Sequence, residues 1–338
     1  MRERVDAIIT FCRKHRLILL IAAAVVLCAA PLVLKTSSTR ILCRILMYCT
    51  LAGSLNVING YSGQTCMGQA GFFAIGAYTT AILLARTSLS FWLILPISGV
   101  LAALTGLIIV MPTLKMKGIY LSVITLGASE IIRLLALNRT SLTGGAYGMK
   151  DIARPHIFGF VFNTPFRFFY LFLAVALVFL LCTRRVLRSR VGRAWMSIRE
   201  GELAAASLGI AVSRYKVSNF MYGAFWAGIA GSVYAPYLQY IDSSVFALDE
   251  GFNILSMVVI GGQGTLIGPI VGSIIVNLLT EALRVIGQWR YVIYAMIIIL
   301  MMWVRPQGLV GATNSVLSGG KMSAKKLRKA GTEKEASK

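Results

Sequence analysis

The chain has 338 residues, of which 57% are hydrophobic and only 14% are charged. A mean hydropathy of +0.76 excludes an ordinary soluble domain and predicts a helical protein that crosses a membrane several times. The formal net charge of +22 would suit a nucleic-acid partner in a soluble protein. Nucleic-acid binding is not expected here, because no basic patch alternates with aromatic stacking residues.

Nine apolar runs follow one another along the chain, at 17–34, 41–58, 64–86, 91–111, 118–137, 166–183, 216–237, 252–278 and 282–304. The first run follows a basic start and ends in a poor cleavage site, so we expect a retained span rather than a signal peptide. The pattern predicts an all-α polytopic fold with about eight to ten transmembrane helices.

Basic residues cluster beside the apolar runs: 21 of the 34 lie in the segments 1–16, 184–216 and 305–338. Such clusters are typical of cytoplasmic segments, where anionic membrane lipid supplies the counter-charge. The segment 238–250 contains three acidic residues and no Lys or Arg, so it is expected to face outward. The sequence thus predicts a cytoplasmic N-terminus (1–16), a transmembrane domain (17–311) and a disordered cytoplasmic tail (312–338).

An odd number of full spans would place the two basic ends on opposite sides of the membrane, so one segment should be broken or re-entrant. Irregular backbone at membrane depth needs protein or a water-filled cavity around it. Two glycine-rich runs fit, 60–76 and 261–272, and paired interrupted segments in transporters lie beside the pathway. Plain helix packing is the alternative, since Gly264, Gly268 and Gly272 follow at four-residue intervals that permit close backbone approach.

Two ionisable residues lie within the apolar run 118–137, Glu130 and Arg133. Their i, i+3 spacing favours a local ion pair that offsets part of the cost of membrane insertion. A gradient-driven secondary carrier would use such a carboxylate as a proton relay. Both interpretations, the structural pair and the relay, stay open at this point.

The segment between Asn138 and Pro165 is expected to lie outside the membrane and contains Thr143, Gly144 and Gly145. Its glycines would let backbone amides approach a carboxylate or a partner surface. An ordinary flexible loop explains the composition equally well.

The basic segment 184–216 has a centre that positive charge alone does not explain. It contains eight basic residues: Arg184, Arg185, Arg188, Arg190, Arg193, Arg199, Arg214 and Lys216. Among them Glu200 and Glu202 precede three alanines, which favour a short helix, and Gly209 is a natural C-terminal cap for it. Gly201 is expected to weaken this helix by about 1 kcal/mol relative to alanine. The pattern indicates a docking surface, with a solvated basic connector as the alternative.

Motifs for chemistry are missing from the sequence. It contains no phosphate-binding loop and no G-x-S-x-G nucleophile motif, and the two histidines, His15 and His156, lack metal-ligand spacing. Six cysteines are scattered without C-x-x-C spacing, which is typical of reduced, buried thiols. We therefore expect no catalytic residues, no metal site and no cofactor bound by this chain.

Several motifs in the chain resemble branched-chain amino acid ABC importer permeases, and their order along residues 40–311 is the same. The first group is Gly63-Gln64, Gly68 and Ala70-Gly71-Phe72-Phe73, and the second is Gly118-Ile119-Tyr120, Glu130-Ile131-Ile132-Arg133 and Leu142-Thr143-Gly144-Gly145. The third is Gly192-Arg193-Ala194, Ile198-Arg199-Glu200, Ala204-Ala205 and Leu208-Gly209-Ile210. The fourth is Gly261-Gly262-Gln263-Gly264-Thr265 and Arg305-Pro306-Gln307-Gly308-Leu309. The group that ends with Leu142-Thr143-Gly144-Gly145 resembles the larger, M-type permease subunit in particular. Ala206 departs from the family, in which a glutamate is common at that position.

The resemblance implies an ABC importer permease fold in a bacterial inner membrane, with both termini cytoplasmic. It implies as partners a second permease subunit, two cytoplasmic ATPase subunits that bind ATP and magnesium, and a periplasmic or lipid-anchored substrate-binding protein. The cargo would be leucine, isoleucine or valine, and importers of urea or short-chain amides are the alternative within the same family.

The resemblance and the glycine pattern together give two sets of candidate residues. The segment 184–216 would be the ATPase coupling loop, with Gly192, Arg193, Arg199, Glu200, Glu202, Ala204, Ala205 and Gly209 at the interface. The translocation pathway would include Gly63, Gln64, Gly68, Gly71, Thr143, Gly144, Gly145, Gly262, Gln263 and Gly264.

Overall fold

The computed structural model describes residues 35–114, 116, 118–157 and 160–283, together with 293, 295, 296, 299, 300, 303 and 308–310. The predicted span 17–34, most of the predicted span 282–304 and the two basic ends, 1–16 and 312–338, lie outside the described residues.

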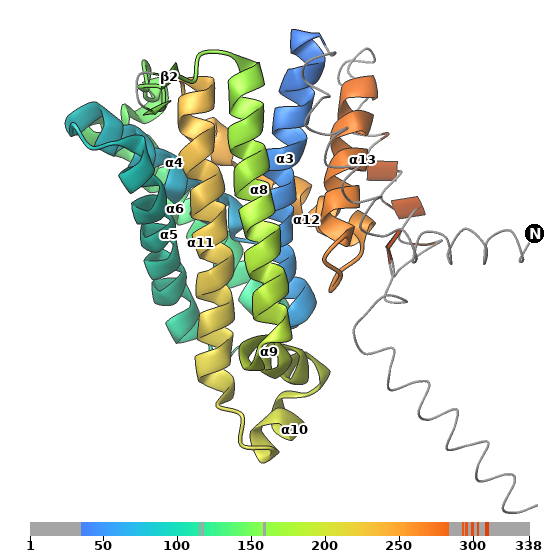
Figure 1. Cartoon of the computed structure of the whole chain (residues 1–338). Coiled ribbons are helices and arrows are strands. Elements are labelled where there is room, and N and C mark those ends of the chain that lie inside the picture. Colours follow the sequence, from blue (N-terminus) through green and yellow to red (C-terminus); the bar gives the residue numbers. More distant parts are fainter. Residues whose placement is uncertain are drawn as a thin grey trace, which may run out of the picture.

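The described chain is mainly a bundle of helices (Figure 1). The longer ones are α3 (Thr36–Asn56), α4 (Gln69–Arg86), α5 (Phe91–Thr113), α6 (Ile119–Asn138), α8 (Pro165–Arg188), α11 (Val212–Leu238), α12 (Leu248–Gly261) and α13 (Gly268–Ala282). Short elements join them: the π-helix η1 (Val57–Tyr61), α7 (Thr140–Thr143), η2 (Gly145–Tyr147), α9 (Arg190–Glu200), α10 (Glu202–Ser207) and η3 (Ser243–Phe246). The strands β1 (His156–Ile157) and β2 (Phe160–Val161) form an antiparallel pair in which His156 lies opposite Val161.

The two ends of the bundle differ in structure. Helices α9 and α10 project beyond one end, called here the loop end, and β2 lies at the other, the far end (Figure 1). At the far end the segment 139–164 is tied to the chain after α11, because Met149 and Ile241 exchange backbone hydrogen bonds of 2.9 and 3.1 Å. Residues 149–152 are therefore held by backbone partners rather than lying in an unconstrained loop.

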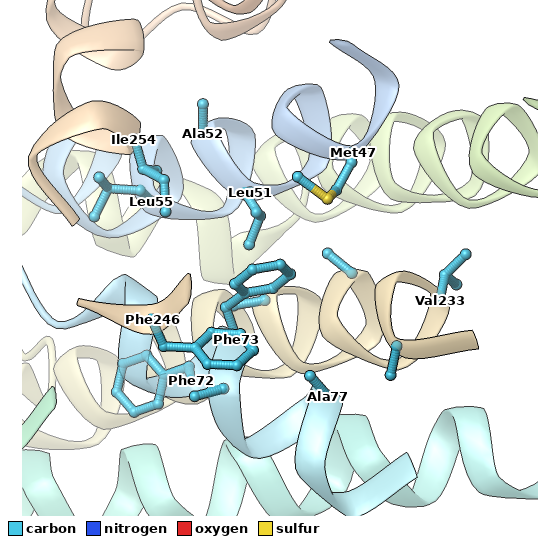
Figure 2. Close-up of a cluster of buried hydrophobic side chains, with 14 of the residues drawn as sticks. Met47, Leu51, Ala52, Leu55, Phe72, Phe73, Ala77, Val233, Phe246 and Ile254 are labelled. Atoms are coloured by element: carbon cyan, nitrogen blue, oxygen red, sulfur yellow. The ribbon is translucent and has the colours of Figure 1, made fainter. Parts of the chain in front are cut away.

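Helix α11 lies at the centre and packs mainly against α4 and α5, and also against α3. Glycine makes this possible, since a Cβ on Gly76 of α4 would collide with the Gly228 carbonyl of α11. Aromatic side chains fill the rest of the interior, and Figure 2 shows Phe72 and Phe73 beside Phe246, with the Phe73 and Phe246 ring centroids 5.3 Å apart. Buried aliphatic residues of α3, including Leu51 and Leu55, form the facing layer.

Four described helical stretches are long and apolar enough to cross a membrane: Thr36–Tyr61, Phe91–Thr113, Ile119–Asn138 and Pro165–Arg188. The described residues therefore support a polytopic helical fold without establishing the predicted number of spans. Helix α11 falls outside this group, and near its start it carries the buried polar side chains of Lys216 and Asn219.

The predicted run 252–278 is interrupted, as its glycines indicated. Helix α12 ends at Gly261 and α13 begins at Gly268, and the two pack as an antiparallel hairpin. A Cβ on Gly272 would collide with the Met257 carbonyl, and one on Gly268 with the Gly262 carbonyl, so the two backbones touch. Gly264 does not belong to this glycine face, because it lies in the turn with φ +76°. Helices of 14 and 15 residues span about 21–23 Å, which is less than the roughly 30 Å hydrocarbon core.

The predicted run 64–86 is shorter than expected at its start. Helix α3 passes into the π-helix η1, which ends at Tyr61, and α4 begins only at Gln69. Residues 62–68 are thus a second interruption, called the first break below, and residues 262–267 are called the second break.

Candidate functional site: the helical loop and the two breaks

The segment 184–216, called the helical loop below, is largely helical. Helix α8 continues to Arg188, so its basic residues Arg184, Arg185 and Arg188 lie on the last turns of a long helix. Apolar composition ends near Cys182, but a helix can continue past the membrane edge wherever its side chains are soluble. Helices α9 and α10 follow, and α11 begins at Val212.

Helix α9 is held against the bundle by a tight turn and one buried indole. The Ser189 side chain caps it by accepting a hydrogen bond from the Val191 amide, 3.2 Å. Gly192 packs directly on the end of α8, where a Cβ would collide with the Leu187 backbone. Trp195 is 1% exposed and donates its Nε1 hydrogen to the Tyr215 carbonyl of α11, 3.0 Å away. Helix α9 is thereby fixed to α11.

Helix α10 forms where the alanines predicted it and ends as Gly209 predicted. The Gly209 amide donates to the Ala206 carbonyl (2.9 Å) and the Ile210 amide to the Ala205 carbonyl (3.1 Å), a Schellman cap with Gly209 at φ +78°. Gly201 lies between α9 and α10 in an extended conformation, so it does not weaken a helix interior as expected but separates two helices.

The surface of α10 and its cap is apolar where it points away from the bundle. Leu203 is 83% exposed and Leu208 79% exposed, although both are large hydrophobic residues. Arg193, Arg199, Glu200 and Ala204 are also exposed, whereas Gly192 and Ala205 are buried. The sequence analysis named Ala204 and Gly209 for this surface but missed the two leucines, whose exposure depends on the direction in which α10 leaves the bundle.

Lys216 is not one of the solvated basic residues of the loop, contrary to the sequence-based grouping. It lies in the first turns of α11, is 5% exposed, and its ammonium group pairs with the Glu202 carboxylate of α10. The pair connects the start of α10 to α11. In a solvated connector this ammonium would lie in water. Its burial therefore favours a segment that is packed against the bundle.

The second break packs against the end of α3 and against η1, which leads into the first break. Asn56, at the end of α3, donates from Nδ2 to the Thr265 carbonyl (2.8 Å) and accepts at Oδ1 from the Gly264 amide (2.8 Å). Gly60 lies so close to the second break that a Cβ there would collide with the Gly264 amide. One buried amide side chain at the end of α3 therefore satisfies the irregular backbone of the second break.

A polar network connects the first break to α11. Asn219 donates to the Val57 carbonyl (3.0 Å) and accepts from the Ser62 hydroxyl (3.0 Å). Gln64 is 5% exposed and donates to Ser62 Oγ at 2.8 Å and to the Lys216 carbonyl at 3.3 Å. Gln64 thus supports the backbone of the break instead of presenting its amide to an open space.

Arg199 of α9 reaches both breaks. Its Nη1 donates to the Gly60 carbonyl, and its guanidinium fills the space that a side chain on Gly264 would occupy. A pocket of about 540 Å³ opens beside it, lined by Ser62, Gly63, Ile198, Arg199, Gly201, Glu202, Leu203 and Ala204.

Residues near the C-terminus close the end of α12. The Leu309 amide donates to the Ile260 carbonyl (3.0 Å) and the Val310 amide to the Gly261 carbonyl (3.1 Å). Gly308, at φ +77°, packs so closely on Gly262 that a Cβ would collide with it. The sequence motif at 305–309 suggested a family match only, and its contact with the second break is a finding of the structure.

The remaining candidate pathway residues lie elsewhere. Thr143 Oγ1 donates within the far-end segment to the Ala136 carbonyl (2.5 Å), and Gly144 and Gly145 form the following turn with positive φ. Gly68 and Gly71 pack against α6, where a Cβ on either would press on Thr125 or Ser129. Of the proposed set, Gly63 and Gly264 contact Arg199 of α9. Gly262 and Gln263 belong to the same break as Gly264, and Gln64 bonds to the Lys216 carbonyl of α11.

Glu130 and Arg133 form the ion pair that their spacing favoured. Arg133 Nε lies 2.9 Å from both carboxylate oxygens of Glu130, and both side chains are partly exposed, 29% and 22%. The bidentate pair stabilises the charged carboxylate, whereas a proton relay requires a carboxylate that changes its charge readily.

Within the described part of the chain, no group of three or more His, Cys, Asp or Glu could hold a metal ion. Cys43, Cys49 and Cys66 are free and buried, and Cys182 is free and exposed.

Comparison with known proteins identifies related chains. The family model described as "Branched-chain amino acid transport system / permease component" matches residues 37–302. The high-affinity branched-chain amino acid transport system permease protein LivM of Escherichia coli is 34% identical over 321 residues, which cover 88% of this chain and 76% of that protein. A probable LivM of Methanocaldococcus jannaschii is 25% identical over 63% of this chain and 66% of its own length.

A second kind of relative is also similar to the chain. The permease protein LivH of Escherichia coli, from the same kind of transport system, is 23% identical over 294 residues, covering 78% of this chain and 91% of LivH. No solved structure gives a significant match.

Proposed function

The chain belongs to the branched-chain amino acid transport permease family, and we propose that it is the M-type membrane subunit of an ABC importer for leucine, isoleucine and valine. The observation that carries the proposal is the family match over residues 37–302 combined with the projecting helices α9 and α10. The chain would bind no nucleotide itself, and ATP and magnesium would be bound by partner ATPase subunits.

The helical loop supports a role in docking the ATPases. Large apolar side chains on a projecting element, such as Leu203 and Leu208, are costly to leave in water and are typical of a protein interface. Helix α10 is rigidly attached, by the Glu202–Lys216 pair and the Schellman cap, so a push on it would reach the bundle. We place the loop end in the cytoplasm, in agreement with its many arginines.

The partners follow from the same proposal. Similarity to both LivM and LivH supports pairing with a second, related permease, and a periplasmic or lipid-anchored binding protein would deliver the amino acid at the far end. The breaks at 62–68 and 262–267 would move when the ATPases close, so that the spans alternate between outward-open and inward-open states in an inner membrane.

Reconstitution tests the function directly. The chain, the second permease and two ATPases in proteoliposomes, with the binding protein outside, should take up leucine only when ATP is enclosed with the ATPase domains. A variant ATPase with its catalytic lysine replaced is the control. Uptake by this chain alone, driven by a proton or sodium gradient and abolished by Glu130→Gln, would overturn the proposal. Competition by urea or short-chain amides, but not by isoleucine or valine, would keep the ABC importer and change the cargo.

A further inference from the structure

Arg199 occupies a notch formed by one glycine from each break. A Cβ built on Gly63 would lie 3.2 Å from Cγ and 3.5 Å from Cβ of Arg199, so the stem of the arginine rests on the first break. A Cβ built on Gly264 would lie 3.3 Å from Arg199 Cζ and would collide with Nη1. The head of the same side chain therefore rests on the second break.

The backbone of both breaks is shaped for this arginine. Gly63 has φ +70° and Gly264 has φ +76°, values that L side chains rarely adopt, and a side chain on Gly264 would displace the guanidinium. The Gly60 carbonyl accepts a hydrogen bond from Nη1. A hydrogen bond from a charged donor is about twice as strong as a neutral one, so this is the strongest polar link described between α9 and the breaks.

Helix α9 otherwise contacts α8, α10, α11 and η1, and it shares Trp195 with α11. Arg199 stands four residues after this anchor, about one helical turn closer to the end of α9 and to Gly201. A displacement of α10 acts first on this end. Because one side chain contacts both breaks, the displacement reaches the two together.

We propose that Arg199, although it is exposed, is a positioning residue that transmits movement of the helical loop to both breaks through its contacts with Gly63 and Gly264. This inference rests on the proposed function, because the movement would be imposed by partner ATPases. It separates Arg199 from Arg193 and Glu200, with which it was grouped by sequence.

The first experiment compares Arg199→Ala with Arg190→Ala in the reconstituted importer. Arg190 is the matched control, since it is an exposed arginine of the same helix but lies at the first residue of α9, at the opposite end of the helix from Arg199. The Arg199→Ala variant should still purify with both ATPases and should still hydrolyse ATP. The amount of leucine taken up per ATP hydrolysed should fall about tenfold, which corresponds to a loss of about 1.4 kcal/mol. Arg199→Lys should restore part of this ratio, because an ammonium can still donate to the Gly60 carbonyl.

Two results would overturn the inference. Loss of the ATPases from Arg199→Ala would make Arg199 a docking residue, and an unchanged ratio of uptake to hydrolysis would leave it without a role in transmission. The ratio is decisive because a merely structural defect lowers uptake and hydrolysis together, in proportion to the folded complex that remains.

The second experiment tests the contact without relying on any partner. Cysteines replacing Gly63 and Arg199 would have Cβ atoms about 3.5 Å apart, within the range that a disulfide requires, in a background with Cys182→Ser. The pair should cross-link in the permease expressed alone, while Cys at 63 and 193 should not. No cross-link in the first pair would refute the contact itself.

The same cysteine pair then reports movement in the full complex. A non-hydrolysable ATP analogue should change the rate of cross-linking, and an equal rate with and without the analogue would refute transmission through this contact. Failure of the proposed function would show differently, as absence of ATP-dependent uptake in the parent complex while the cross-link still forms.

Discussion

The ammonium group of Lys216 and the carboxylate of Glu202 pair at the loop end, the lysine side chain 6% exposed and the glutamate 27% exposed. The two partners are thus unequal: removing the glutamate leaves a buried ammonium without its counter-charge, while removing the lysine leaves a carboxylate that water can still reach. Breaking a buried pair from one side is costly mainly through the charge that remains.

This inequality predicts an order of stabilities. Glu202→Gln should destabilise the detergent-solubilised permease more than Lys216→Met, by about 1–3 kcal/mol, because the latter variant replaces the buried charge with an apolar chain of similar length. Thermal unfolding followed by tryptophan fluorescence measures both. Equal losses, or a larger loss for Lys216→Met, would contradict the assignment of the buried partner.

The hairpin of α12 and α13 predicts a sharp contrast between two glycines. Gly272→Ala should destabilise the protein by about 1–3 kcal/mol, because its Cβ would collide with the Met257 carbonyl, a backbone atom that cannot rotate away. Gly127→Ala in α6 is the matched control: nothing lies within 4 Å of its Cβ, and alanine favours a helix by about 1 kcal/mol. Urea or thermal unfolding should therefore separate the two variants in opposite directions.

Hydropathy and glycine spacing predicted much of the fold, because a helix that enters a membrane must be apolar over its length and because closely packed backbones exclude side chains. The interruption between Gly261 and Gly268 and the cap at Gly209 were both predicted in this way. The charge pattern did less well, since it counts residues without placing them: it grouped buried Lys216 with solvated arginines.

The contacts that join the candidate site could not be predicted from the sequence. Arg199 lies 139 residues from Gly60, and Asn56 lies 208 residues from Gly264. Each link needs one polar side chain and one irregular backbone segment, and neither has a periodic pattern that would point to its partner. Whether the proposed pathway residues line a route for substrate stays a prediction.

The cap of α10 yields a further pair of predictions. Gly209→Ala should cost about 1–2 kcal/mol, because alanine at φ +78° is strained. Gly201→Ala should be close to neutral for stability, because its extended backbone suits any residue and its Cβ would meet Ala204 Cβ at 3.7 Å, an ordinary contact. Thermal unfolding of both variants checks the contrast. A gain of about 1 kcal/mol for Gly201→Ala would mean that α9 and α10 form one continuous helix, in which alanine is more favourable than glycine.

The exposed leucines lead to a prediction about assembly instead of stability. Leu203→Ser and Leu208→Ser should each change the free energy of unfolding by less than about 1 kcal/mol, because neither side chain is buried in the permease. If both leucines insert into the ATPases, each variant should reduce the amount of ATPase that purifies with the permease, since a well-buried apolar anchor contributes about 1–3 kcal/mol to an interface.

A matched control for this assembly experiment is Leu89→Ser, an exposed leucine between α4 and α5 on a segment away from the helical loop. It should leave ATPase binding unchanged, because it is an exposed leucine too, at 43%, but lies away from the helical loop. Titration of purified ATPase onto the immobilised permease gives the dissociation constant for all three variants. If both leucine variants bind the ATPase as tightly as the parent does, α10 is not part of the interface. The surface of α9, with Arg193 and Glu200, would then be tested next by Glu200→Arg.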